Sequence, residues 1–339
     1  MKTNLLKSRL FIHVKKPKII VVLGPTASGK SELAIKLAFW LNSKQARKRF
    51  GINGAEVISA DSRQVYKGLD IGTGKVPGKW KATSDTRPGK SVFVYGGIVH
   101  HLIDFVNPKK VFAVVDYQKL ATRALKQILK RNCMPIVCGG TGFYIDALIY
   151  DYRLPKVKPN RKLRKKLETL NVATLYALLK KKDPRRAKTI DPYNPRRLIR
   201  ALEIVMCSNK PVPKLSPKES PYIVLKLGVV LPWPKLQRKI EIRLKKRIKE
   251  GLLKEVRALH KRGLSWQRLR ELGLEYRYAA EYLTGKIITK HDFKSKLAQE
   301  IKKYAKRQIT WFKKDPTIQD VKNFKQIKKK AVNFLIEVT

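Results

Sequence analysis

In the first 150 residues, short apolar runs alternate with longer stretches of helical spacing. The apolar runs predict buried strands at Lys18–Leu23, Glu56–Ser59, Val92–Tyr95, Val99–Ile103 and Met134–Cys138. The helical spacing predicts helices over Ser31–Lys48 and Val114–Arg131, and a Pro- and Gly-bearing surface loop at 76–91. Continuous apolar strands between amphipathic helices are typical of a parallel sheet covered on both faces. We therefore predict an α/β core.

The pattern changes near residue 150. Residues 151–208 are helical in spacing, heavily basic and interrupted by prolines, which predicts an inserted helical module. A proline-bearing linker (209–221) follows, and then an apolar run (222–231) that predicts one more strand returning to the core sheet. The last part predicts helices at 233–262, 268–283 and 291–314. The expected divisions are a basic N-terminal extension (1–17), a core (18–150), the module (151–208), the linker (209–221) and a part that completes the core (222–339).

A phosphate-binding motif lies between the first strand and the first helix. The stretch GPTASGKS matches the P-loop pattern and consists of Gly24, Pro25, Thr26, Ala27, Ser28, Gly29, Lys30 and Ser31. Backbone N–H groups of such a loop, together with the helix N-terminus, hold phosphate oxygens. Lys30 adds a mobile cation, and Ser31 adds a hydroxyl for phosphate-bound Mg²⁺. The motif predicts a P-loop NTPase-like sheet, although a tight turn without a ligand would use the same glycines.

The net charge of the chain is extreme. Lys and Arg number 77 against 25 Asp and Glu, which gives +52 over 339 residues. A chain so charged favours a polyanion, with nucleic acid first and anionic membrane second, while a lysine-rich host proteome would give the same excess. No apolar run reaches 18 residues, so we expect no membrane partner. The three cysteines are too few and badly spaced for a zinc or disulfide framework, and we expect a cytoplasmic protein.

Two further stretches place polar residues at strand ends. Asp61 follows the strand of EVISADS, which is the place of the Mg²⁺- and water-ordering Asp in P-loop ATPases. The stretch PIVCGGTGFYIDAL ends its strand in Gly139, Gly140 and Thr141. Such glycines allow a close backbone approach, and the Thr141 hydroxyl would lie beside the phosphates. A plain turn capped by Thr141 is the alternative interpretation.

Six stretches in order carry a family resemblance: GPTASGKS, EVISADSRQVYKGLDIGTGK, HHLIDFVNP with VVDYQ, PIVCGGTGFYIDAL, NPRRLIRALEI and KRQITWFKK. Together they resemble the bacterial tRNA dimethylallyltransferases (tRNA isopentenyltransferases), from about Lys18 to about Lys314. The resemblance implies that the P-loop holds dimethylallyl diphosphate, whose diphosphate is the leaving group, and that ATP is no fuel. The implied reaction transfers the dimethylallyl group to the exocyclic 6-amino group of the adenosine 3′-adjacent to the tRNA anticodon.

The family pattern also implies roles for single residues. Because an exocyclic amine is a weak nucleophile, it needs a general base, which is assigned to Asp61. The departing diphosphate needs dense positive charge, which Lys30, Mg²⁺ on Ser31 and Arg243 in KIEIRLKKR would supply. Thr141 would hydrogen-bond to the bridging or leaving oxygen. The residues expected to contact the tRNA anticodon stem-loop are Ser62, Arg63, Gln64, Arg164, Arg196, Arg197, Arg200, Lys306, Arg307, Gln308, Thr310, Trp311 and Lys313. Taken singly, each Lys or Arg fits a solvated surface equally well.

The chain departs from the common family pattern in its connections. The segment WKATSDTRPGKSVFVYGG (80–97) is longer than usual, residues 43–54 are extended, and RELGLEYRY replaces a shorter form, which leaves the tRNA contacts around 270–276 open. Rival hypotheses are a dimethylallyltransferase for free adenine nucleotide, an RNA-binding P-loop ATPase, and an RNA-binding protein with a decayed loop. A small substrate needs neither the basic module nor KRQITWFKK, and the intact motifs disfavour decay. We expect a monomer.

Overall fold

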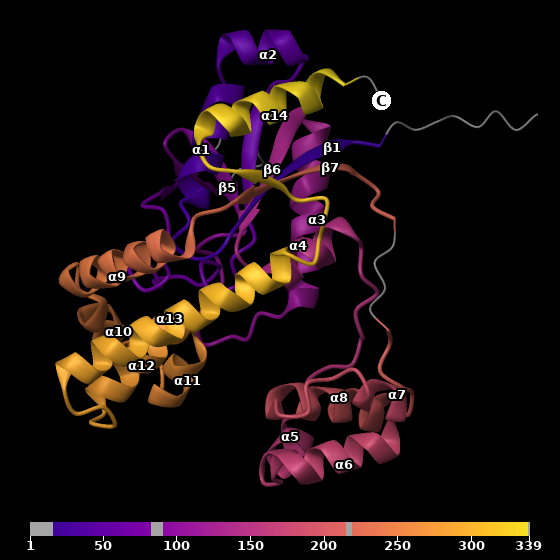
Figure 1. Cartoon of the computed structure of the whole chain (residues 1–339), viewed down its shortest axis with the longest axis vertical. Helices are drawn as coiled ribbons and strands as arrows, with labels where there is room; N and C mark the ends of the chain where they lie inside the picture. Colours follow the sequence, from indigo (N-terminus) through magenta and orange to yellow (C-terminus); the bar gives the residue numbers. More distant parts are fainter. Residues whose placement is uncertain (1–15, 83–90, 215–218, 338–339) are drawn as a thin grey trace, which may run out of the picture. The chain divides into compact units, whose positions relative to one another are not determined.

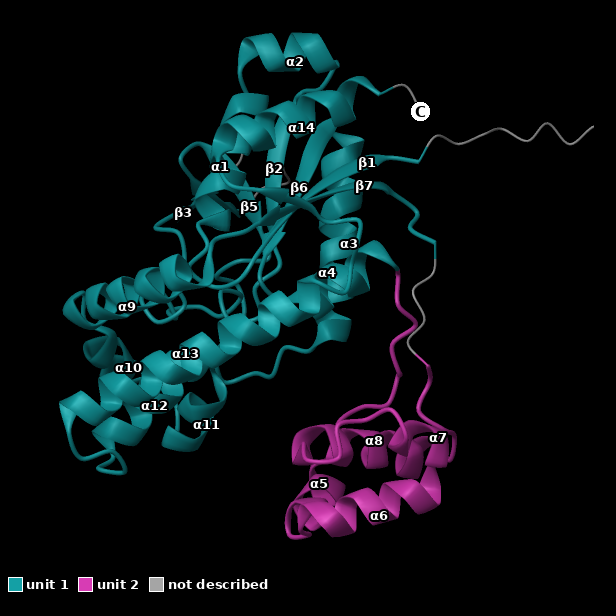
Figure 2. Ribbon diagram, in the orientation of Figure 1, with its two compact units in different colours: residues 1–150, 219–339 teal, residues 151–218 magenta. Residues whose placement is uncertain are grey.

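The computed structural model describes residues 16–82, 91–214 and 219–337 (Figure 1). The chain divides into two compact units, residues 1–150 with 219–339 and residues 151–218 (Figure 2). The expected N-terminal extension lies outside the described residues, apart from Lys16 and Pro17. Within the described ranges, no helix is both long and apolar enough to cross a membrane.

The first unit is built on an eight-stranded sheet of order β3-β4-β5-β2-β6-β1-β7-β8. Six neighbouring strands run parallel: β5 (Ile98–His101), β2 (Gly54–Ser59), β6 (Cys133–Gly139), β1 (Lys18–Leu23), β7 (Ile223–Val229) and β8 (Gln319–Val321). The predicted parallel core is thus confirmed, as is the strand that returns after the insertion.

One edge of the sheet differs from the prediction. The strands β3 (Lys79–Ala82) and β4 (Ser91–Tyr95) run antiparallel, so the surface loop expected at 76–91 contains a strand. All four residues of β3 are exposed, and therefore no apolar alternation reveals it in the sequence. The remainder of that loop, 83–90, lies outside the described residues.

Helices cover both faces of the sheet (Figure 1). On one face lie α1 (Lys30–Leu41) and α14 (Phe324–Ile336), and on the other lie α3 (Val114–Lys130) and α4 (Gly142–Ile149). Alternate residues of β1 face the two layers: Ile20 and Val22 pack with α1 and α14, whereas Ile19, Val21 and Leu23 pack with α3 and α4. Burial on both sides explains why β1 is apolar from Ile19 to Leu23.

The helix predicted at 31–48 is two helices. The first, α1, ends at Leu41, and α2 (Lys44–Phe50) begins after Ser43, whose side chain accepts a hydrogen bond from the Ala46 N–H (3.3 Å). A serine N-cap of this kind restarts the chain in a new direction. The short β8 and the helix α14 were not predicted.

Two of the predicted C-terminal helices are also divided. The segment 233–262 forms α9 (Trp233–Lys249) and α10 (Leu252–Lys261), separated at Gly251 (φ +107°). Likewise, 268–283 forms α11 (Trp266–Glu271) and α12 (Leu274–Leu283), separated at Gly273 (φ +137°). Only glycine adopts these angles readily, so each break is a local property of the chain. The last predicted helix is confirmed as α13 (Lys290–Phe312).

The C-terminal helices form their own core against the loop that follows β2. Val65, Tyr66 and Leu69 of this loop are buried among α9, α10, α12 and α13. This packing fixes the loop that begins at Asp61 relative to the sheet.

The second unit consists of α5 (Arg161–Glu168), α6 (Val172–Lys182), α7 (Pro184–Ala187) and α8 (Pro195–Ser208) around an apolar cluster of its own. Glu203 of α8 is completely buried in it. Its carboxylate accepts hydrogen bonds from the Asn160 N–H (2.6 Å), from Arg164 (2.7 and 2.8 Å) and from Arg200. Burial alone would raise the pKa of Glu203, but the two guanidinium groups outweigh it and hold this pKa below its usual value.

We expect Glu203→Ala to destabilise the second unit by on the order of 3 kcal/mol, because two arginines and a backbone N–H lose their buried acceptor. Hydrogen exchange of the full chain should then accelerate within 151–218 and stay slow in the sheet. The control is Glu168→Ala, which removes an exposed carboxylate from α5 of the same unit. Unchanged exchange in the Glu203 variant would contradict the structural role of this carboxylate.

Candidate active site

Three stretches of chain meet at the carboxyl ends of three adjacent strands. The register pairs Leu23 with Gly139 and Ser59 with Cys138, so β1, β6 and β2 end level with one another. The P-loop follows β1, Asp61 follows β2, and Gly140–Thr141 follows β6. This edge of a parallel sheet is where open α/β folds bind their ligands.

The P-loop has the backbone that its glycines permit. Gly24 (φ +156°) and Gly29 (φ +92°) turn the chain, and α1 starts at Lys30. Within the described residues, the buried Ser28 hydroxyl has no hydrogen-bond partner. A buried hydroxyl without a partner is costly, which indicates that this loop is shaped for a polar ligand.

Lys30 lies between the P-loop and the end of β6. Its amine donates to the Pro25 carbonyl (3.2 Å), and a side chain on Gly140 would lie 3.3 Å from the Lys30 Nζ. Burial lowers the pKa of Lys30, while the negative charge of Asp61 acts in the opposite direction. The same burial raises the pKa of the Cys138 thiol to about 11, so this cysteine is a neutral part of the wall.

Asp61 and Thr141 are held by backbone hydrogen bonds. The Asp61 Oδ1 accepts from the N–H groups of Arg63 (2.8 Å) and Gln64 (3.3 Å), which fixes the carboxylate at the start of the loop. The Thr141 Oγ1 accepts from the Ser62 N–H (3.2 Å). Because a hydroxyl that accepts a bond keeps its own proton, Thr141 can donate to a ligand oxygen.

Arg243 reaches the P-loop from α9. Its guanidinium donates to the Thr26 hydroxyl, which joins residues 217 positions apart in the chain. Burial, followed by the like charge of Arg247, lowers the pKa of Arg243 to about 9, so the group is protonated at neutral pH. The Asp61 carboxylate acts on both Arg243 and Lys30, which places all three charges in one electrostatic environment.

Gln308 differs from its expected role as a tRNA contact. Its side chain is buried, its Oε1 accepts from the Thr26 N–H (2.8 Å), and its Nε2 donates to the Gly140 carbonyl (2.7 Å). Both ends of the amide are therefore used inside the protein, where they tie α13 to the P-loop. The sequence contains a signal for this role, because Gln308 is a polar residue on the buried stripe that includes Ile301 and Ala305 of α13.

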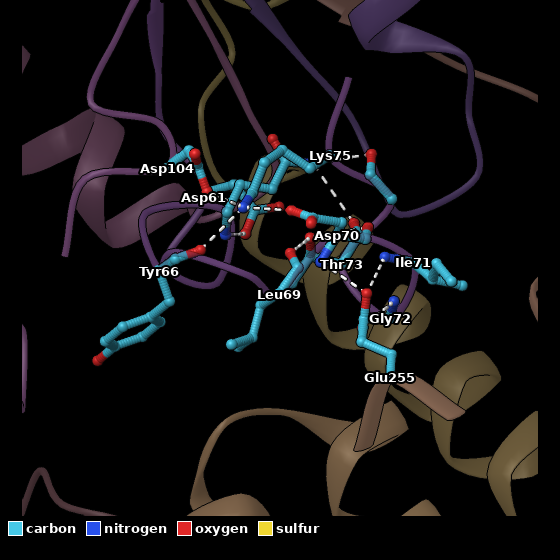
Figure 3. A network of polar contacts seen from close by, with 12 residues as sticks. Asp61, Tyr66, Leu69, Asp70, Ile71, Gly72, Thr73, Lys75, Asp104 and Glu255 are labelled. Atoms are coloured by element: carbon cyan, nitrogen blue, oxygen red, sulfur yellow. Dashed lines mark hydrogen bonds and ion pairs between the residues drawn. The ribbon is translucent and has the colours of Figure 1, made fainter. Parts of the chain in front are cut away.

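Sequence reasoning also missed the groups that hold the loop after Asp61 (Figure 3). The Glu255 carboxylate of α10 accepts from the N–H groups of Asp70 (3.0 Å), Ile71 (2.7 Å) and Gly72 (3.1 Å). The Lys75 side chain is buried and donates to Asp104 and Asp70 and to the Tyr66 carbonyl. In the sequence, Glu255 looks like an ordinary surface charge on an amphipathic helix, so nothing there predicts that it holds this loop.

The remaining residues of KRQITWFKK lie on or near the surface. The Trp311 indole donates to the Asp146 carboxylate (3.0 Å) and contacts Gly142, the first residue of α4. Gly142 directly follows Thr141 in the chain. Lys306 lies over the Trp233 ring (5.1 Å) and Arg307 over Tyr304 (5.8 Å). The exposed residues of this stretch are Lys306, Arg307, Thr310, Trp311, Lys313 and Lys314.

The residues around Asp61 and those of the second unit are placed differently. The Ser62 N–H binds Thr141, the Gln64 amide donates to the Gly74 carbonyl (3.2 Å), and Arg63 is exposed. In the second unit Arg196 and Arg197 are exposed at the start of α8. Arg164 and Arg200, also expected to contact tRNA, bind Glu203, because a buried carboxylate needs cationic partners, and both side chains stay partly exposed.

The expected Mg²⁺ would bind at the P-loop, beside Ser31. Among the described residues, no three His, Cys, Asp or Glu side chains gather into a metal cage. Ser31 is exposed in the first turn of α1, beside the phosphate loop. Mg²⁺ is often bound by one or two protein oxygens together with substrate phosphates and water. The Ser31 hydroxyl therefore fits an ion that arrives with a diphosphate.

Comparisons with known proteins agree with this geometry. The family model described as IPP transferase matches residues 64–315. The chain is 38% identical over 296 residues to tRNA dimethylallyltransferase 1 of Syntrophus aciditrophicus, covering 87% of this chain and 89% of that one. It is likewise 38% identical over 306 residues to tRNA dimethylallyltransferase of Anoxybacillus flavithermus, with 89% of each chain covered.

Solved structures give the same result. The tRNA isopentenylpyrophosphate transferase of Bacillus halodurans is similar with a TM-score of 0.62 at 32% identity, covering 94% of this chain and 96% of that one. A eukaryotic dimethylallyltransferase acting on tRNA is similar with a TM-score of 0.65 at 26% identity, covering 94% of this chain and 78% of that one. With the family model matched across most of its length, this chain belongs to the IPP transferase family, the family of the tRNA dimethylallyltransferases.

Proposed function

We propose that this protein transfers the dimethylallyl group of dimethylallyl diphosphate to the exocyclic 6-amino group of the adenosine 3′-adjacent to the tRNA anticodon, releasing diphosphate. One observation carries the proposal. The P-loop, Asp61 and Thr141 converge at the carboxyl ends of three adjacent strands, and Arg243 contacts the same loop from α9. A phosphate cradle thus lies beside a carboxylate suited to a base.

The P-loop side holds the leaving group. As the bond from carbon to the diphosphate oxygen breaks, negative charge collects on the diphosphate. Lys30, Arg243 and the loop N–H groups stabilise that charge, and their burial strengthens the effect because little water screens it. Thr141 donates its proton to the bridging or leaving oxygen. When Mg²⁺ is bound, Ser31 holds it and the ion neutralises part of the diphosphate charge.

Asp61 acts at the opposite side of the reacting carbon. The adenosine amine gains a bond to carbon and must lose a proton, which the Asp61 carboxylate accepts. The backbone bonds from Arg63 and Gln64 occupy Oδ1, so Oδ2 is the oxygen available to the amine. The target base must leave its stack in the anticodon loop to reach this position.

The tRNA side combines exposed cations with one aromatic ring. We assign contacts with the RNA backbone to Arg63, Lys306, Arg307, Thr310 and Lys313 of the first unit and to Arg196 and Arg197 of the second, and base stacking to Trp311. Ser62 and Gln64, which follow Asp61 in the chain, would lie next to the target adenine. Gln308 supports the P-loop from inside the protein, whereas Arg164 and Arg200 are partly exposed and hold Glu203 in the second unit.

The test is a transfer assay with labelled dimethylallyl diphosphate, Mg²⁺ and an unmodified tRNA carrying adenosine after the anticodon. Free AMP and a tRNA lacking the target adenosine are run beside it. We expect label only in the first tRNA. Label in AMP would show a free-nucleotide transferase, and ATP hydrolysis without transfer would show an ATPase, so either outcome would overturn the proposal.

A further inference from the structure

Two neighbouring helices of the first unit, α2 and α14, form a strongly basic surface. The sequence of α2 is KQARKRF, in which Lys44, Arg47, Lys48 and Arg49 are all exposed. The sequence of α14 is FKQIKKKAVNFLI, in which Lys325, Lys328 and Lys329 are exposed. Neither helix contains an acidic residue. We call these seven cations the α2/α14 face.

The cations of this face have no carboxylate partner within the part of the chain that the structure describes. Some exposed or half-exposed cations elsewhere in the same unit do pair, as Lys36 does with Glu32 (2.6 Å), Lys302 with Glu241 (2.6 Å) and Arg131 with Glu56 (2.8 Å). In a folded chain, like charges that lie close together without counter-charges repel one another. A polyanion would relieve this repulsion.

Aromatic side chains join the two helices. Trp40 of α1 contacts both, because Lys328 of α14 lies over its ring (5.1 Å) and Phe50 of α2 meets it edge-on (5.7 Å). Arg49 lies over the Phe50 ring (5.5 Å), and the neighbouring Phe39 of α1 is 69% exposed. Cations interleaved with aromatic rings are the composition that binds single-stranded nucleic acid, through phosphate contacts and base stacking.

This face lies away from the candidate active site. The P-loop is at the start of α1, and α2 begins after its end, about 18 Å further along for a helix of 12 residues. Figure 1 shows α2 and α14 at the end of the sheet away from α9 and α13. Lys328 of α14 lies over Trp40, which is next to the last residue of α1, so this part of α14 adjoins the end of α1 that is remote from the P-loop.

We propose that the α2/α14 face is a second RNA-binding surface, which holds the phosphate backbone of single-stranded RNA outside the anticodon stem-loop. A membrane fits the face less well. An interfacial helix inserts a free apolar side, whereas Ile327, Ala331 and Phe334 of α14 are already buried against the sheet. The occupant is a single strand of RNA separate from the substrate tRNA, because the aromatic rings among these cations suit unpaired bases.

The test compares two four-site variants of equal charge. Arg47→Gln, Lys48→Gln, Lys325→Gln and Lys329→Gln together neutralise the α2/α14 face. The control neutralises four exposed cations on α3, at the opposite face of the sheet: Lys119→Gln, Arg123→Gln, Lys126→Gln and Lys130→Gln. Fluorescence anisotropy measures binding of a labelled oligouridylate, of the anticodon stem-loop and of full-length tRNA, each over a range of salt concentrations.

We expect the α2/α14 variant to bind oligouridylate on the order of tenfold more weakly, with a salt slope shallower by about 0.7 for each phosphate that the variant no longer neutralises. Weaker binding of oligouridylate, with the affinity for full-length tRNA nearly unchanged, is the pattern expected for a separate RNA. Transfer to the stem-loop should continue at the parental rate, so the result does not depend on the proposed reaction. A charge-preserving variant, Arg47→Lys with Lys48→Arg, Lys325→Arg and Lys329→Arg, should bind normally and controls for folding.

Three outcomes would overturn the proposal. Equal weakening by the α3 control would assign the effect to the overall charge of +52. Unchanged RNA binding by the α2/α14 variant would remove the face from RNA recognition. Loss of binding to phosphatidylglycerol vesicles with RNA binding intact would assign the face to a membrane surface.

Discussion

Asp61→Asn is expected to lower kcat by on the order of 10²–10⁴ and to leave tRNA affinity nearly unchanged. The amide keeps the oxygen that accepts the N–H bonds of Arg63 and Gln64, so the turn after β2 should persist. What the variant lacks is a carboxylate that can accept the proton of the adenosine amine. Single-turnover transfer to saturating tRNA, with a separate binding titration, measures the two effects.

The control is Asp70→Asn in the same loop. Asp70 is exposed and shares its cation with Asp104, so its replacement should leave transfer close to the parental rate. If Asp61→Asn reduced tRNA affinity as steeply as rate, the residue would be a binding contact. If it kept the parental rate, another group would be the base.

Arg243→Gln is expected to lower the rate of transfer by on the order of 10²–10³, because the developing charge on the diphosphate loses a buried cation. Lys30→Ala should cost a similar factor for the same reason. Arg243→Lys separates charge from geometry, since an ammonium keeps the charge and loses the fork that reaches Thr26. Single-turnover rates at saturating dimethylallyl diphosphate are the measurement.

Arg238→Gln is the matched control for this position. It removes an exposed arginine from α9 and lowers the net charge equally, so the transfer rate should not change. A parental rate for Arg243→Gln would exclude Arg243 from leaving-group stabilisation. A rate decrease shared by Arg238→Gln would point to the general charge of α9.

Local sequence was sufficient for the core strands and for the order of the chemical motifs. The central strands are buried on both faces, so they are apolar apart from residues such as Glu56 of β2 and Lys226 of β7, and Lys18–Leu23 is found at its predicted bounds. Local sequence was insufficient where several helices follow one another. Gly251 and Gly273 divide long apolar stripes, yet a glycine within a helical pattern does not reveal its φ angle. The exposed β3 has no pattern of its own.

The sequence could not show which groups the long polar side chains bind. Arg164 and Arg200 belong to a basic stretch typical of an RNA-binding surface, but both form ion pairs with the buried Glu203. Gln308 belongs to a basic surface motif, but it faces the P-loop from the inner side of α13. Lys, Arg and Gln reach far from their backbones, so their partners depend on which distant segment packs beside them.

The motifs alone were enough to identify a P-loop α/β protein of the dimethylallyltransferase family, because a phosphate loop and strand-end residues must occur at fixed local spacing. Three contacts became visible only in the folded chain: Arg243 contacts Thr26, Glu255 holds the loop after Asp61, and Trp40 contacts both α2 and α14. These contacts join residues far apart in the chain. Their physical basis is the packing of helices on a shared sheet, which no local pattern specifies.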